Sequence, residues 1–194
     1  AAGEGNDASF LLDADDGDDK DDVLKRAFVG VEPVAFPNEE LGRVSDADAL
    51  ACFRRLSKLR RIDALCPDEY LFEALSVLPR DVKDEVLGGS AVMAVREGSK
   101  GSTVHYSSSS LVVPAAKLVT IDSKPVNPTG AGNAYSAAFS ALLGTGSDIK
   151  EAACLATGVG AVVCEWEGLP PWTEEVIGRV REAAAEVRDK LKHV

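Results

Sequence analysis

The chain has 194 residues and a formal net charge of −11, and its length suffices for one domain with a full hydrophobic core. The negative charge repels nucleic acid and anionic membrane surfaces, so neither is expected as a partner. Four scattered cysteines without a C-x-x-C pair, and two distant histidines, argue against a zinc site. We expect an intracellular protein of a reducing compartment, cytoplasmic or plastid.

The beginning of the chain is polar and acidic. The first residue is Ala rather than Met, so we expect a fragment, a processed chain or a truncated gene product. Residues 1–22 include seven aspartates between Asp13 and Asp22, which predicts a disordered acidic segment or solvated loop, with cation binding as an alternative. Residues 23–194 are expected to form the folded domain.

The central part of the chain alternates between helix and strand patterns. A short helix and a buried strand near residues 33–36 come first, followed by a helix capped at Ser45. Compact apolar runs bounded by glycines predict strands further along the chain. The predicted helices cover residues 46–60, 67–78 and 80–87, and the predicted strands cover residues 91–95, 102–106, 111–114 and 117–121.

Three helices are expected in the C-terminal part. The first begins after Gly132 and ends at Gly144, the second is capped by residues 147–148, and the third begins at Thr173. The order of elements predicts an α/β fold in which helices cover a sheet.

The most informative stretch is Asn127-Pro-Thr-Gly-Ala-Gly-Asn133, which leads into an apolar helix. A helix N-terminus presents free backbone amides and the positive end of the helix dipole, and small residues let a phosphate approach them closely. A dinucleotide fingerprint is excluded because Tyr135 stands where its third glycine belongs, and no P-loop sequence is present. A tight loop before a buried helix is the alternative to a phosphate site.

The same stretch resembles the second signature of the PfkB (ribokinase-like) carbohydrate kinases, which reads Asp-Thr-Thr-Gly-Ala-Gly-Asp. Three weaker similarities follow the order of that family: residues 36–41, residues 92–102 and residues 153–161. The resemblance implies the C-terminal portion of a ribokinase-like, three-layer αβα (Rossmann-like) domain. It also implies transfer of the γ-phosphoryl group of ATP, with Mg²⁺, to a sugar or sugar-like hydroxyl.

The resemblance implies roles for individual residues. Gly130, Ala131 and Gly132 stand at the anion hole, and Asn133 stands at the position of the general base. Further expected contacts are Thr129, Gly98, Gly101 and Thr157 to the nucleotide, and Asn38 and Glu40 to the metal.

The chain departs from the family pattern at its acidic positions. Asn133 and Asn127 replace aspartates, and Leu41 falls where the Pro-Asn segment of the family has a glutamate. An amide oxygen accepts a hydrogen bond but is not basic, and general-base assistance is worth ~10²–10⁴-fold in rate. A loose transition state reduces that requirement. Asn133 is therefore expected to weaken or abolish base catalysis.

Three functions remain open from the sequence. The first is a carbohydrate kinase seen as its nucleotide-side portion. The second is a noncatalytic descendant that binds nucleotide or serves as a protein scaffold, with a protein partner or a homodimer. The third is an α/β domain with a chance Gly-Ala-Gly sequence. The feature that discriminates between them is the N-terminal half, which carries most of the sugar site in the family. A longer gene product that contains this half would favour the kinase.

Overall fold

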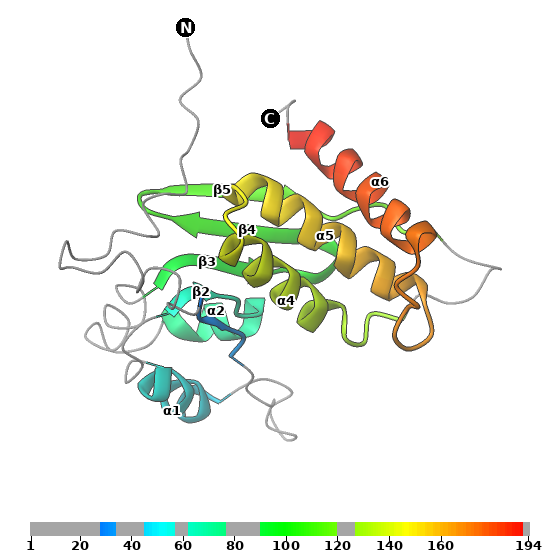
Figure 1. The fold of residues 1–194 in the computed structure, drawn as a ribbon. Coiled ribbons are helices and arrows are strands. Elements are labelled where there is room, and N and C mark those ends of the chain that lie inside the picture. The colour runs from blue at the N-terminus through cyan, green and yellow to red at the C-terminus, as the bar shows by residue number, and fades with distance from the viewer. Residues whose placement is uncertain (1–27, 34–44, 57–61, 77–89, 120–126, 192–194) are drawn as a thin grey trace, which may run out of the picture.

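The computed structural model describes residues 28–33, 45–56, 62–76, 90–119 and 127–191. They form a five-stranded sheet with helices on both faces, which confirms the predicted α/β class (Figure 1). The predictions for the acidic segment 1–22, for Asn38 and Glu40, and for a helix over residues 80–87 lie outside the described residues.

The sheet changes from parallel to antiparallel at its central strand. Its order is β1 (Gly30–Val31), β2 (Ile62–Leu65), β3 (Ser90–Arg96), β4 (Gly101–Tyr106) and β5 (Ser109–Pro114). The first three strands are parallel, and the last three form an antiparallel meander. The carboxyl ends of β1, β2 and β3 therefore meet at one edge, which is where open α/β sheets usually place their ligands.

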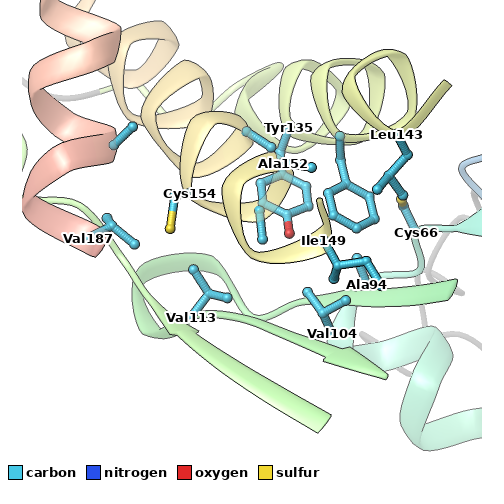
Figure 2. Close-up of a cluster of buried hydrophobic side chains, with 14 of the residues drawn as sticks. Cys66, Ala94, Val104, Val113, Tyr135, Leu143, Ile149, Ala152, Cys154 and Val187 are labelled. Carbon is cyan, nitrogen blue, oxygen red and sulfur yellow. The ribbon is translucent and has the colours of Figure 1, made fainter. Parts of the chain in front are cut away.

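One face of the sheet is covered by three helices, α4 (Ala131–Gly144), α5 (Ile149–Glu165) and α6 (Glu174–Leu191). Side chains of these helices and of β2 to β5 form the largest apolar cluster (Figure 2). Helices α5 and α6 approach closely at Gly158, where an added Cβ would lie 2.5 Å from the carbonyl oxygen of Val180. The large core on this side holds α4 in a fixed position relative to the strands.

The other face of the sheet carries α1 (Asp46–Leu56) and α2 (Glu69–Ser76). Leu71 and Leu75 of α2 pack against Met93 and Val95 of β3. The backbone amide of Asp48 donates to the hydroxyl of Ser45, so the predicted cap of α1 is confirmed. No helix among the described residues is both long enough and apolar enough to cross a membrane.

Most predicted elements are present, with three differences. Residues 117–119 are not a strand: the amide of Val119 donates to Glu165 and the carbonyl of Lys117 accepts from Arg179, so these backbone groups bond to side chains instead of a neighbouring strand. The short strand β2 was not predicted. The first strand, expected near residues 33–36, lies at Gly30–Val31, while residues 34–36 are outside the described part.

Helix α4 ends at Gly144, as predicted, but Gly144 is not the residue that terminates it. Gly144 is the last helical residue and Gly146, with φ of 87°, adopts the left-handed conformation. The amide of Gly146 donates to Leu143 and that of Ser147 donates to Leu142. These two bonds form a Schellman motif, in which the terminating glycine follows the cap residue.

Candidate functional site

The loop before α4 is held in a specific conformation. The amide of Asn127 donates to the carbonyl of Cys164 in α5, and its side-chain oxygen accepts from the amide of Thr129 at 3.0 Å. Gly130 then takes a left-handed conformation with φ of 83°, which a glycine adopts without steric cost. Asn127 thus acts as a turn residue, a role that its side chain fills without a carboxylate.

The first turn of α4 has no side-chain cap. Gly130, the N-cap residue, has no side chain to accept a hydrogen bond, and the first turn contains no acidic residue. The amide of Ala131 donates to Pro128, and that of Ala134 donates to Gly130. Within the described part of the chain, the amides of Gly132 and Asn133 have no acceptor. The helix therefore presents free donors and its positive dipole end at this point.

Asn133 lies in this first turn with an exposed side chain. The structure therefore places Thr129, Gly130, Ala131, Gly132 and Asn133 on one continuous turn that opens to solvent. That placement agrees with the sequence-based expectation for these five residues, whose contacts with a nucleotide remain predictions.

The glycine turn between β3 and β4 directly precedes Ser102, whose hydroxyl meets Tyr135 of α4. Gly98 begins a single 3-10 turn with φ of 58°, and Gly101 follows it with φ of 109°. A Cβ on Gly101 would overlap the backbone of Val113 in β5, so close strand packing requires this glycine. Gly101 therefore has a structural reason to be glycine besides its predicted contact with a nucleotide.

A buried hydrogen bond couples this turn to α4. The hydroxyls of Ser102 and Tyr135 are 2.9 Å apart, and the ring of Tyr135 stacks on Phe139. Figure 2 shows Tyr135 between α4 and the sheet, with its hydroxyl toward the strands. Burial raises the pKa of Tyr135, while the bond to Ser102 opposes that rise. The tyrosine stays neutral and fixes the first turns of α4 relative to the start of β4.

The structure also brings two charged residues to this place that the sequence did not single out. Arg96 ends β3 and Glu32 follows β1, and their side chains form an ion pair with a 2.8 Å separation. The Nε of Arg96 also donates to the carbonyl of Cys66 at the end of β2. A Cβ built on Gly132 would collide with the Arg96 guanidinium, so that group lies directly against the first turn of α4.

The thiol of Cys66 is buried beneath these charges. Burial raises its pKa to about 12, and nearby Arg96 acts in the opposite direction. A thiol with such a pKa is protonated at neutral pH and is not a nucleophile. Cys66 therefore contributes packing and its backbone carbonyl, and no covalent chemistry.

Thr157, the remaining described residue that was predicted to contact the nucleotide, bonds within its own helix. Thr157 is buried in the middle of α5, where its hydroxyl donates to the carbonyl of Ala153. Lys100 forms an exposed ion pair with Glu69 of α2. The described residues contain no group of three or more His, Cys, Asp or Glu side chains suited to a metal ion. No described residue is therefore assigned to Mg²⁺, and Asn38 and Glu40 fall outside the described part.

Comparison with known proteins identifies the family. Residues 43–172 match the family described as pfkB family carbohydrate kinase, and the chain belongs to that family. A nucleoside kinase from Methanocaldococcus jannaschii is 27% identical over 131 residues, which cover 66% of this chain and 42% of that protein. An ATP-dependent ribose-1-phosphate kinase from Halopiger xanaduensis is 32% identical over 133 residues, covering 68% and 40%. The chain therefore matches about two fifths of each of these relatives.

Solved structures agree on the fold. The crystal structure of the Methanocaldococcus jannaschii nucleoside kinase, a member of the ribokinase family, superposes with a TM-score of 0.54 at 24% identity, covering 80% of this chain and 48% of that one. A nucleoside kinase from Burkholderia thailandensis in complex with ADP-inosine has a TM-score of 0.53 at 21% identity, covering 69% and 41%. At these identities the likeness establishes a ribokinase-family fold.

Proposed function

We propose that this chain is the nucleotide-side portion of a pfkB-type kinase, which transfers the γ-phosphoryl group of ATP to a hydroxyl of a sugar or nucleoside. The observation that carries the proposal is the uncapped first turn of α4, which lies beside Arg96 at the carboxyl edge of the sheet and has two amides without an acceptor among the described residues. Amides directed at a developing negative charge stabilise it without reorganisation, and phosphoryl transfer depends mainly on such positioning and charge stabilisation.

The acceptor class is supported by the relatives, which include a nucleoside kinase and a ribose-1-phosphate kinase. Both act on molecules that contain a pentose, so pentoses and nucleosides are the first acceptors to test. Mg²⁺ would neutralise phosphate charge in such a reaction, and Asn38 and Glu40 remain its proposed ligands.

Asn133 supports a second candidate, a protein that binds nucleotide without transferring phosphate. Its side chain is exposed on the turn where the family base is expected, and it can orient an acceptor hydroxyl by accepting its hydrogen bond. It cannot take the proton, which must pass to water or to the phosphoryl group. The two candidates share the phosphate site and differ in whether turnover survives.

A coupled assay of ADP release from ATP separates these candidates. The full-length gene product is incubated with Mg·ATP and with ribose, ribose 1-phosphate, inosine or adenosine in turn. The kinase proposal expects release that depends on one acceptor and increases ~10²-fold or more in the Asn133→Asp variant, because a base is restored. If the rate of ADP release is the same with and without each acceptor in both proteins, and both bind ADP normally, the noncatalytic candidate is favoured. Absence of ADP binding contradicts both.

A further inference from the structure

The Glu32–Arg96 pair is unusual in its position relative to α4. Both side chains are largely buried, with 15% of the Arg96 side chain and 19% of the Glu32 side chain exposed. The guanidinium lies against Gly132, in the first turn of the helix. A helix N-terminus favours anions, whereas cations are favoured at the other end. Arg96 and the dipole of α4 therefore place two positive groups together.

Such an arrangement requires a negative charge, and Glu32 supplies one in the structure. The carboxylate contacts the Nη1 atom of Arg96, the atom that also lies nearest to Gly132. The Nε atom is fixed separately by the carbonyl of Cys66. The guanidinium therefore keeps an anchor on the backbone if its partner at Nη1 changes.

We propose that Arg96 is a phosphate-binding residue and that Glu32 is its internal counter-anion in the empty site. When phosphate binds, it replaces Glu32 as the partner of Arg96, in whole or in part. The inference rests on the proposed nucleotide site and adds the residue that gives it positive charge. An arginine fork binds phosphate oxygens well, with hydrogen bonds stronger than those of neutral donors. Glu32 neutralises Arg96 while the site is empty, and repels the incoming phosphate.

The two partners of one ion pair should then have opposite effects on binding. Replacing Arg96 removes an attractive group, so Arg96→Gln should weaken ADP binding about tenfold or more, consistent with one charge-assisted hydrogen bond. Replacing Glu32 removes a repulsive group and leaves Arg96 held by Cys66, so Glu32→Gln should tighten ADP binding about threefold. A purely structural ion pair would make the two variants behave alike.

The test is isothermal titration of ADP and of adenosine into the wild-type chain and both variants, without added metal. Adenosine carries no phosphate, so its affinity should be the same in all three proteins. The control is Arg188→Gln, which breaks a more exposed Arg–Glu ion pair between Arg188 of α6 and Glu151 of α5. That variant should bind ADP as the wild type does. Thermal unfolding of each protein verifies that it is folded, and Arg96→Met, which also removes the charge, is used if Arg96→Gln does not fold.

The outcomes separate this inference from the proposed function. Opposite shifts in ADP affinity at positions 32 and 96, with adenosine unaffected, support it. If the wild type binds ADP but both variants weaken binding equally, or neither changes it, the inference is wrong and the nucleotide site stands. If the wild type binds no ADP, the proposed function fails and the inference fails with it.

Discussion

The helices α4 and α5 lie on the same face of the sheet, but the unpaired backbone amides at their N-termini are treated differently. In α5 the side chain of Asp148 accepts a hydrogen bond of 3.0 Å from the backbone amide of Glu151, and the Glu151 side chain pairs with Arg188. In α4 the cap is Gly130, the first turn has no acid, and a cation lies beside it. A terminus that only supports the fold is satisfied by its own side chains. The one at α4 leaves the amides of Gly132 and Asn133 without an acceptor in the described part of the chain, as the proposed phosphate site requires.

The largest expected effect is at Gly132, where the two termini differ most. Gly132→Val places a branched side chain in the space of the Arg96 guanidinium. ADP binding should become too weak to detect by titration, while the far-ultraviolet circular dichroism stays that of the wild type. Gly178→Val, in α6, is the control because nothing lies within 4 Å of a Cβ added there. Normal ADP binding by Gly132→Val would show that phosphate does not approach this turn.

The contact between α5 and α6 should affect stability alone. In Gly158→Ala the new methyl group meets the backbone of Val180, which cannot move independently of α6. Overpacking of this kind costs about 1–3 kcal/mol in free energy of unfolding. Urea denaturation measures the loss, and ADP affinity at low temperature should remain unchanged. A stability equal to that of the wild type would mean that α5 and α6 pack less closely than described.

A substitution at the N-cap of α5 should have the opposite pattern of effects to Gly132→Val. Asp148→Ala removes the acceptor for the Glu151 amide, and loss of such a cap costs ~1 kcal/mol in free energy of unfolding. The thermal midpoint should fall accordingly, with ADP affinity unchanged. A loss of ADP affinity in this variant would show that both helix termini contribute to one site, and the contrast between them would no longer hold.

The smallest expected effect concerns the charge at Asn133. Asn133→Asp adds a negative charge to the turn proposed to bind phosphate, so ADP binding without magnesium should weaken about two- to threefold. Titration at low ionic strength gives the clearest reading, because salt screens exposed charges. Tighter binding by the Asp variant without metal would contradict the assignment of this turn to phosphate.

Much of the fold could be predicted from the sequence because its signals are local. The apolar run before Arg96, the caps at Ser45 and Asp148, and the change to a helical period after Gly132 all correspond to observed elements. Strand β2 gave little signal because it has only four residues and one of them is Asp63. Its burial follows from the two neighbouring strands and both layers of helices, which a local pattern does not reveal.

The site could be predicted in part for the same reason. The turn from Thr129 to Asn133 is continuous in sequence, and its residue types alone indicate an anion site. Glu32 and Arg96 meet only because β1 and β3 flank β2 in a parallel arrangement, so their pairing depends on strand order. A charged residue directly after a predicted strand is the available signal. It was present at Arg96, which follows the strand predicted over residues 91–95, but not at Glu32, because the first strand was expected near residues 33–36.

Thermal stabilisation of the wild-type chain by ADP tests the central claim most directly. The unfolding midpoint is followed against ADP concentration, with adenosine and Gly132→Val measured alongside. Because a ligand that binds only the native state stabilises it by RT ln(1 + [L]/Kd), we predict that the midpoint rises with the logarithm of ADP concentration above Kd, rises more than with adenosine, and does not rise in Gly132→Val. No shift with millimolar ADP, or equal shifts in both proteins, would contradict the claim that the open end of α4 binds phosphate.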